Sequence, residues 1–140
     1  AAGADGVHLG QSDMPVREAR RLMGPDALIG VSVETLEQAQ EAEKEDVDYL
    51  GVSAIFATPT KKDTAAEWGL GGLERLRPLS RRTLVAIGGL NDENAAAVIR
   101  AGADGIAVVS AVCAAGDPEK AARRLREIID PELGRRRRTP

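Results

Sequence analysis

The stretch Tyr49-Leu50-Gly51-Val52-Ser53-Ala54-Ile55, followed by Phe56-Ala57-Thr58-Pro59-Thr60-Lys61-Lys62-Asp63-Thr64, decides how the rest of the chain is interpreted. Its first part is rich in small and aliphatic side chains, which predicts a buried strand. Its second part places threonine hydroxyls and two lysines directly after that strand. Parallel sheets and barrels bind ligands at the carboxyl ends of their strands. Hydroxyls donate hydrogen bonds to phosphate oxygens and an ammonium offsets their charge, so this loop is a candidate phosphate site. A solvated polar loop is the alternative.

A strand–helix alternation extends from this stretch in both directions and repeats about five times. The predicted strands are residues 5–9, 28–33, 48–55, 83–87 and 105–109, and the predicted helices are residues 15–23, 36–45, 73–79, 91–100 and 119–129. The glycine-rich residues 69–72 are expected to form a loop. This alternation predicts a parallel sheet with right-handed crossovers. An open doubly wound sheet and a (β/α) barrel both satisfy the pattern.

Composition narrows the function classes. Of the 140 residues, 43% are hydrophobic but only 2% are aromatic, which argues against a surface that stacks nucleic-acid bases. The net charge of −3 gives no overall basic field, so nucleic acid is not an expected partner. No window approaches about 20 consecutive apolar residues, so no membrane span is predicted. The single cysteine, Cys113, is expected to be a small buried residue and is typical of a cytoplasmic protein. A homo-oligomer stays open.

Two further segments end predicted strands in the same way as the threonine–lysine loop. They are Ile87-Gly88-Gly89 and Val109-Ser110-Ala111. Glycine allows backbone N–H groups to approach a phosphate closely, and a helix that starts after the loop adds a positive dipole. The plainer alternative is that these glycines only turn the chain. Because both loops point to the same chemistry, we expect them to bind phosphate.

Other polar residues near strand ends have two interpretations each. Asp13 follows the first strand and is either a Mg²⁺ ligand or a helix cap. Ser32 closes the second strand and either faces a ligand or caps a turn. His8, the only histidine, is expected to be a hydrogen-bonded structural residue. Of the adjacent lysines, Lys61 is favoured over Lys62 to point inward.

The two ends of the chain differ from its body. Ala1-Ala2-Gly3-Ala4-Asp5-Gly6 is similar to Gly102-Ala103-Asp104-Gly105-Ile106, which follows a predicted helix. We therefore interpret residues 1–130 as the C-terminal portion of a longer domain. Residues 131–140, which include Arg135-Arg136-Arg137-Arg138, are expected to form a basic, disordered tail.

Together these motifs resemble the thiamine phosphate synthase family. The matching segments follow the family order and cover nearly all of the chain up to Ile129; they are residues 4–13, 29–32, 49–61, 86–89 and 102–111. The threonine–lysine motif is specific to the family, whereas many phosphate-binding barrels share the glycine motifs.

The resemblance implies a TIM (β/α) barrel, with about the last five βα units present here. It also implies a cytoplasmic transferase of thiamine biosynthesis. Such an enzyme joins hydroxymethylpyrimidine diphosphate to thiazole phosphate, forms thiamine phosphate and releases diphosphate, with Mg²⁺ as cofactor. By motif, Asp13 is a Mg²⁺ ligand, and Ser32 and Lys61 are catalytic and contact the pyrimidine diphosphate. The thiazole phosphate is held by Thr58, Thr60, Gly89, Val109 and Ser110.

Some features depart from the family pattern. Family members carry an asparagine–aspartate pair and a basic stretch on earlier strands, at positions that would precede Ala1. An incomplete barrel also leaves edge strands unpaired and apolar faces exposed, so we expect this 140-residue piece alone to be inactive and poorly soluble or self-associated. Ala57 replaces a common proline, which should be tolerable. Glu34 stands where a histidine is frequent, which argues against the thiazole tautomerase branch.

The alternatives kept open are a non-catalytic thiazole phosphate-binding protein and a tautomerase-like paralogue. A phosphate-binding isomerase would need paired acid–base groups that these strands lack.

Overall fold

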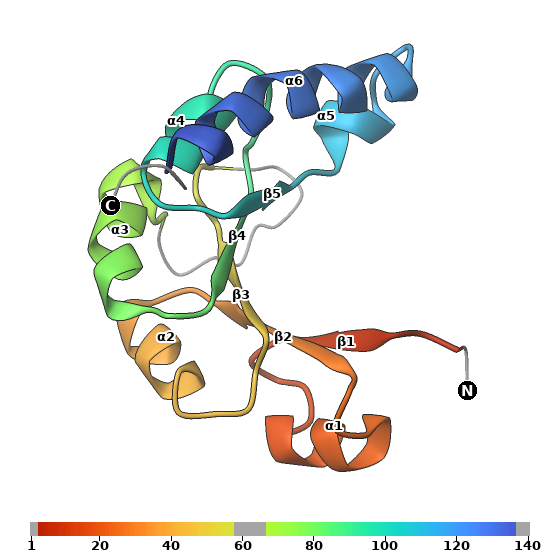
Figure 1. Ribbon diagram of the computed structural model, residues 1–140, viewed down its shortest axis with the longest axis vertical. Helices are drawn as coiled ribbons and strands as arrows, with labels where there is room; N and C mark the ends of the chain where they lie inside the picture. The colour runs from red at the N-terminus through yellow and green to blue at the C-terminus, as the bar shows by residue number, and fades with distance from the viewer. Residues whose placement is uncertain (1–2, 58–66, 137–140) are drawn as a thin grey trace.

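The computed structural model describes residues 3–57 and 67–136, which alternate between short strands and helices (Figure 1). The strands are β1 (Gly6–Leu9), β2 (Leu28–Val33), β3 (Tyr49–Ser53), β4 (Thr83–Ile87) and β5 (Gly105–Ala107). The helices are α1 (Val16–Met23), α2 (Leu36–Ala42), α3 (Gly69–Leu76), α4 (Ala95–Arg100), α5 (Ser110–Cys113) and α6 (Pro118–Arg136), with a 3₁₀ turn, η1, at Arg77–Leu79.

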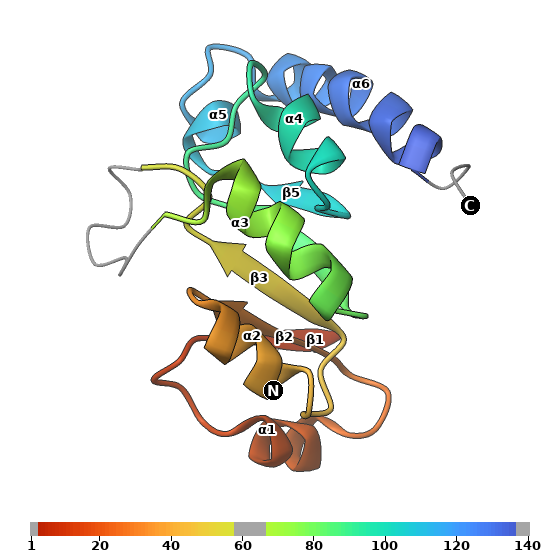
Figure 2. The same cartoon turned by 90° about the vertical axis from the view of Figure 1, so that its left-hand side faces the viewer.

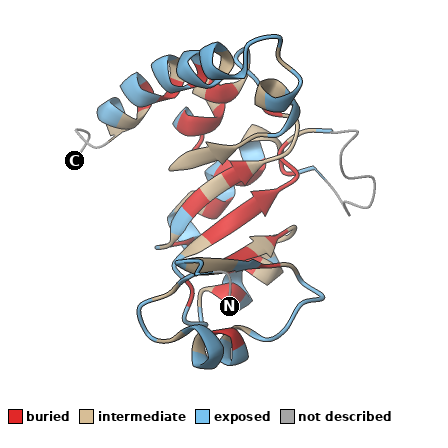
Figure 3. Cartoon of the chain, turned by 90° about the vertical axis from the view of Figure 1, so that its right-hand side faces the viewer, coloured by how far each residue is buried: buried red, intermediate tan, exposed pale blue. Residues whose placement is uncertain are grey.

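The five strands form one parallel sheet in the order β1-β2-β3-β4-β5, so each βα unit adds the next strand on the same side. Helices α2, α3 and α4 lie on one face of this sheet (Figures 1 and 2). Figure 3 looks onto the other face, where the strands lie open to the viewer. A doubly wound sheet reverses its strand order and carries helices on both faces. Over residues 3–57 and 67–136 this sheet does neither, so the (β/α) barrel prediction is confirmed and the doubly wound alternative is excluded.

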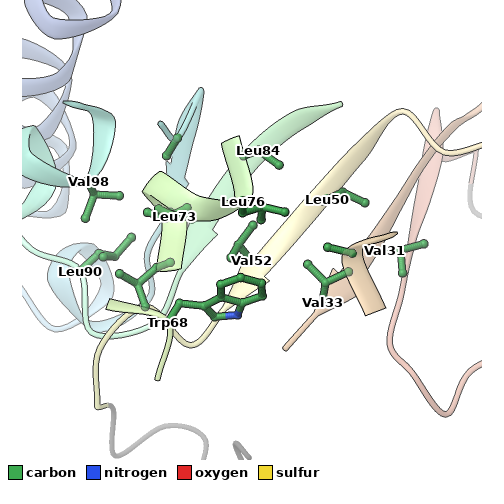
Figure 4. Close-up of a cluster of buried hydrophobic side chains, with 14 of the residues drawn as sticks. Val31, Val33, Leu50, Val52, Trp68, Leu73, Leu76, Leu84, Leu90 and Val98 are labelled. Carbon is green, nitrogen blue, oxygen red and sulfur yellow. The ribbon is translucent and has the colours of Figure 1, made fainter. Parts of the chain in front are cut away.

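The core lies between the sheet and its helices, because alternate strand residues point toward the helical layer. Val33 and Val52, in neighbouring strands, are fully buried, and Leu73 and Leu76 of α3 pack against this layer (Figure 4). Trp68 is only 9% exposed, and its indole N–H donates to the Ser53 carbonyl oxygen at 3.2 Å. Deleting a buried leucine side chain from such a core costs about 2–5 kcal/mol, so this layer contributes strongly to the stability of the fold.

Aspartates fix the amino-terminal ends of two strand pairs in the same way. Asp48 precedes β3, and its carboxylate accepts a hydrogen bond from the Ile29 N–H at 2.7 Å. Asp104 precedes β5, and its carboxylate accepts from the Leu84 N–H at 2.9 Å. In both cases the aspartate N–H donates to the carbonyl of the same partner residue at 2.8 Å. An aspartate at this position therefore sets the register between one strand and the next.

The prediction of a loop at residues 69–72 is wrong, because α3 begins at Gly69. Glycine in a helix costs about 1 kcal/mol relative to alanine, but tertiary contacts override this preference. The Trp68 and Gly69 N–H groups each donate at 2.9 Å to carbonyls just after β3. A Cβ atom at Gly72 would lie 3.0 Å from the Trp68 ring. The first turn of α3 therefore needs a small residue beside the indole.

The prediction of a disordered tail from residue 131 is also wrong up to Arg136, because α6 continues through Pro131. Glu132 is 8% exposed and pairs with Arg100 at 3.0 Å. Arg136 pairs with Asp104 at 3.2 Å and donates to the Ala103 carbonyl oxygen. These contacts offset the hydrogen bond that Pro131 cannot make. Residues 137–140 lie outside the described part of the chain.

Smaller differences concern element ends and one side chain. Thr35 caps α2 as expected, since its hydroxyl accepts from the Gln38 N–H at 3.2 Å. Helix α4 begins later than predicted, with Asn94 as its first flanking residue. The expectation that Cys113 is buried is wrong: it lies at the end of the short helix α5 and is exposed.

Candidate active site

Most of the described candidate residues lie at one edge of the sheet. Because all five strands are parallel, their carboxyl ends meet at the same edge. Asp13 follows β1, Ser32 is next to last in β2, Gly89 follows β4, and Val109-Ser110 follows β5. The structure thus brings residues from four separate βα units to one rim. Thr58, Thr60 and Lys61 lie outside the described residues.

The glycine loop after β4 lies directly against the segment that leads into the threonine–lysine motif. The Ile55 N–H donates to the Ile87 carbonyl at 2.9 Å, and the Phe56 N–H donates to the Gly88 carbonyl at 3.2 Å. Gly88 and Gly89 have φ angles of +100° and +66°, and a Cβ atom at Gly89 would lie 2.8 Å from the Ala57 carbonyl oxygen. Both the backbone angle and the close approach require glycine here.

An asparagine holds the same loop from the other side. The Asn94 amide donates to the Gly89 carbonyl at 2.9 Å. The Asn91 N–H in turn donates to the side-chain oxygen Oδ1 of Asn94 at 3.0 Å. The bond to the Gly89 carbonyl restrains the loop backbone, which favours a site that presents N–H groups to an anion.

Val109 and Ser110 lie where β5 passes into α5. The strand ends at Ala107, two residues earlier than predicted, so both residues belong to the connection and the helix start. Val109 is 60% exposed, and Ser110 is exposed as well. An exposed large aliphatic side chain beside a serine at this edge is available for contact with a ligand.

Asp13 is exposed in a tight turn after β1. Its carboxylate accepts from the Gly10 N–H at 2.6 Å, and its own N–H donates to the Gly10 carbonyl at 3.2 Å. It does not cap α1, whose preceding residue Pro15 makes no side-chain capping bond. Mg²⁺ uses one or two carboxylates together with waters and substrate oxygens, so a single exposed carboxylate fits a Mg²⁺ ligand. In the described ranges no three acidic, histidine or cysteine side chains form a metal cluster.

His8 is hydrogen-bonded as predicted, to partners on two other strands. Its Nδ1 atom lies 2.9 Å from the Tyr49 hydroxyl, and its Nε2 atom lies 2.8 Å from the Ser32 Oγ atom. Partial burial against the sheet lowers the pKa of His8 below its ordinary 6.5, and the nearby Asp13 carboxylate partly opposes this. Burial raises the pKa of Tyr49 above 10.0. At neutral pH, therefore, the imidazole and the phenol are both uncharged.

Sequence reasoning missed Tyr49 and Gln11 as parts of this group. The Gln11 amide donates to the Ser32 carbonyl at 2.6 Å, so Ser32 is held by its backbone as well as by its hydroxyl. One signal was available for Tyr49. The strand period of two places it on the face opposite Leu50, the same face as the serine of the neighbouring strand. No sequence signal identifies Gln11.

Comparison with known proteins gives the family. The family model described as "Thiamine monophosphate synthase" matches residues 1–112. The chain belongs to the thiamine monophosphate synthase family. A thiamine-phosphate synthase from Albidiferax ferrireducens is 62% identical over 130 residues, which are 93% of this chain and 59% of the relative. One from Vibrio parahaemolyticus is 50% identical over 130 residues, which are 93% of this chain and 64% of the relative.

Solved structures agree with this family assignment. A thiamine phosphate pyrophosphorylase from Pyrococcus furiosus superposes with a TM-score of 0.86 at 46% identity, over 94% of this chain and 62% of that one. A 3-hexulose-6-phosphate synthase from Salmonella typhimurium has a TM-score of 0.70 at 22% identity, over 94% of this chain and 64% of that one, and shows the fold alone. The chain thus spans about three fifths of the length of these family members. Among the described helices, none is long and apolar enough to cross a membrane.

Proposed function

We propose that the protein containing this chain is a thiamine phosphate synthase. It would join hydroxymethylpyrimidine diphosphate to thiazole phosphate, with thiamine phosphate and diphosphate as products, in the cytoplasm. The observation that carries the proposal is the family match over residues 1–112, with family motif residues from four βα units lying at one rim of the sheet. Its partners would be these small molecules, and the chain is compatible with a homo-oligomer.

The chemistry fits the side chains that the chain supplies. The bond between the pyrimidine methylene carbon and a diphosphate oxygen breaks, and diphosphate leaves with the bonding electrons. The thiazole nitrogen then donates its lone pair to that carbon, through a pyrimidine carbocation in a dissociative path. The attacking nitrogen carries no proton, so no general base is needed. The demand is instead for positive charge at the leaving group, which is an electrostatic task.

Each candidate residue has a role in this reaction. Lys61 and Ser32 would contact the pyrimidine diphosphate, where the ammonium offsets the charge that develops on the leaving oxygens. Asp13 would help to hold Mg²⁺, which would neutralise further charge on the diphosphate. Thr58, Thr60, Gly89, Val109 and Ser110 would hold the thiazole phosphate. Hydroxyls and the backbone N–H groups of the glycine loop supply the donors for it.

The direct test is product formation by the full-length protein, incubated with both substrates and Mg²⁺. We expect thiamine phosphate and diphosphate in equal amounts, loss of turnover with a chelator, and recovery when Mg²⁺ is restored. No thiamine phosphate under these conditions would overturn the proposal. The 140-residue chain alone, which spans about three fifths of its relatives, is expected to be inactive and to self-associate in a sedimentation experiment.

Calorimetry separates synthesis from simple binding. A protein that releases heat on titration with thiazole phosphate, but forms no product with both substrates, would be the non-catalytic alternative. Loss of thiazole phosphate binding in Gly89→Ala, alongside loss of product, would place both activities at the same rim.

A further inference from the structure

A chain of three hydrogen-bonding side chains crosses the open face of the sheet. Tyr49 in β3, His8 in β1 and Ser32 in β2 are joined by contacts of 2.9 and 2.8 Å, with the imidazole in the middle. The Tyr49 and His8 rings are stacked, with centroids 5.4 Å apart and planes inclined by 29°. Elsewhere in the described residues the Tyr49 hydroxyl makes no hydrogen bond, so its contact with His8 is specific.

Two glycines make room for these rings. A Cβ atom at Gly30 would lie 2.0 Å from the Tyr49 ring, and one at Gly51 would lie 2.9 Å from the His8 ring. Glycine inside a strand weakens it and often marks the close approach of another group. Here Gly30 and Gly51 weaken their strands, but they leave the space in which the two rings lie flat on the sheet. The arrangement is therefore specified by several residues and is not an incidental surface contact.

We propose that Tyr49 is a positioning residue that acts through His8 to direct the proton of the Ser32 hydroxyl toward the bound pyrimidine diphosphate. This inference rests on the proposed function, because it takes the ligand of Ser32 from that proposal. It goes beyond it in assigning a role to Tyr49 and one protonation pattern to the histidine.

The argument depends on which imidazole nitrogen carries the proton. A neutral imidazole has one donor nitrogen and one acceptor nitrogen, and the partner of one nitrogen decides the state of the other. If the Tyr49 hydroxyl donates to Nδ1, then the Nε2–H group donates to the Ser32 Oγ atom, and the serine proton is left for another acceptor. In the opposite pattern Nδ1–H donates to Tyr49, and the Ser32 proton is used up on Nε2.

Physical chemistry favours the first pattern. A phenol, with a pKa near 10, is a far stronger hydrogen-bond donor than an aliphatic hydroxyl. Its oxygen is also the weaker acceptor, because its lone pair is delocalised into the ring. The first pattern pairs the better donor, Tyr49, with an imidazole nitrogen, and the better acceptor, Ser32, with the imidazole N–H. The uncharged states of His8 and Tyr49 at neutral pH are consistent with it.

The rest of the Ser32 environment is compatible with a donor role. The Gln11 amide already binds the Ser32 carbonyl at 2.6 Å, which fixes the backbone at the end of β2. With Nε2–H bound to Oγ as well, the hydroxyl keeps one proton to donate. A diphosphate oxygen or a ring nitrogen of the pyrimidine is an acceptor of the required kind.

The test is the protonation state of the His8 ring, which does not depend on turnover. Full-length protein labelled with ¹⁵N-histidine is studied by ¹H–¹⁵N correlation spectroscopy above pH 7, and His8 is assigned by loss of its signals in His8→Gln. We expect a protonated Nε2 and a bare Nδ1. Tyr49→Phe should release this preference and give a mixture of both tautomers. A protonated Nδ1 in the original protein, or an unchanged pattern in Tyr49→Phe, would overturn the inference.

A matched control removes another hydrogen-bonded hydroxyl, away from His8. Ser80→Ala loses a side chain that is 6% exposed and that donates to Glu43 before β4, away from His8. It should lower stability like Tyr49→Phe but leave the His8 spectrum unchanged. A Ser80→Ala spectrum that changes as in Tyr49→Phe would show that general loosening, and not the lost phenol, moves the proton.

Binding measurements separate this inference from the proposed function. Calorimetry with pyrimidine diphosphate and Mg²⁺ should give an affinity about five- to tenfold weaker in Tyr49→Phe, the effect of one misdirected hydrogen bond. Equal affinity in the two proteins would overturn the positioning role. If the original protein binds no pyrimidine diphosphate at all, the proposed function fails, while the tautomer assignment still stands or falls by the spectra.

Discussion

The two edges of the sheet are built from different kinds of contact. At the amino-terminal edge, charged side chains bind one another and the backbone: Arg77 reaches Asp104 at 2.7 Å, and Arg20 reaches Asp48 at 3.2 Å. At the carboxyl edge, the described polar side chains form fewer ion pairs: they are exposed, hold a glycine loop in place, or join Ser32 to uncharged partners. Asp13 is exposed in its turn, and Gly89 is held by Asn94.

This difference indicates that one edge stabilises the fold and the other is available for ligand binding. A carboxylate that bridges two arginines and a backbone N–H is fully used for structure. One that accepts a single N–H, as Asp13 does, keeps an oxygen for a ligand. In barrels of this kind the amino-terminal face contributes stability and the carboxyl face carries the chemistry. Substitutions at the two edges should therefore change different measurements.

The largest expected effect is on turnover, at the carboxyl edge. Lys61→Ala removes the ammonium proposed to offset charge on the leaving diphosphate, and we expect kcat of the full-length protein to fall by about 100-fold or more. Its melting temperature should stay the same. Lys62→Ala is the matched control and should keep most of the activity. Similar losses in both variants would contradict the assignment of the inward position to Lys61.

The next effect is on stability, at the amino-terminal edge. Asp104→Ala leaves the Leu84 N–H, Arg77 and Arg136 without their shared acceptor, and should lower the free energy of unfolding by about 3 kcal/mol. Denaturant titration measures this change. KM for both substrates should stay within about twofold, the change that a rim left intact would show. Glu119→Ala, which breaks an exposed pair with Arg123, should change stability by about 0.5 kcal/mol or less.

A glycine substitution should affect both properties at once. Gly89→Ala forces a side chain into a backbone conformation with φ of +66°, within 2.8 Å of the Ala57 carbonyl oxygen. We expect a loss of about 2 kcal/mol of stability, together with weaker binding of thiazole phosphate. Gly71→Ala is the control: it lies in α3 with no neighbouring atom within 4 Å and should be neutral or slightly stabilising. Normal thiazole phosphate binding in Gly89→Ala would exclude this loop from the phosphate site.

The smallest expected effect is a difference in pH dependence between the two regions. Burial lowers the pKa of His8 below 6.5, so the unfolded chain binds more protons. This contribution to stability is present above pH 6.5 and is lost as the pH falls through the lowered pKa. The Ile29 N–H lowers the pKa of Asp48 below 3.8, so its contribution is lost only in stronger acid. Unfolding curves of His8→Gln should lack the first loss and keep the second.

The sequence predicted the fold well where one physical rule dominates. The strand at Thr83–Ile87 has the predicted bounds, because aliphatic residues there are flanked by clear turn signals. The prediction failed where tertiary contacts override local preference. Backbone bonds from Trp68 and Gly69 to carbonyls after β3 fix the start of a helix in a glycine-rich segment. The pairing of Arg136 with Asp104 holds the end of α6, beyond Pro131. Trp68 adjoins the segment that it packs on, but its partners after β3 are distant in sequence, and Asp104 lies 32 residues before Arg136.

The sequence predicts which residues meet at the rim of the sheet, but not the hydrogen bonds between them. Residues that follow parallel strands must share an edge, so Ser32 and Gly89 could be grouped from the sequence alone. Whether Ser32 binds a ligand or caps a turn depends on its hydroxyl partner, which is His8, 24 residues away in the chain. The contact between Tyr49 and His8 spans 41 residues. Such pairs can be identified only when the register between the strands is known.

The close approach of Gly30 and the Tyr49 ring also constrains how this sequence can change over time. An added methyl group at position 30 would overlap the ring, at 2.0 Å from its nearest atom. Across related sequences, a residue larger than glycine at that position should therefore occur only together with a smaller side chain at position 49. The two sites are expected to evolve as a pair, and a protein that has made this exchange must direct its serine proton by some other means.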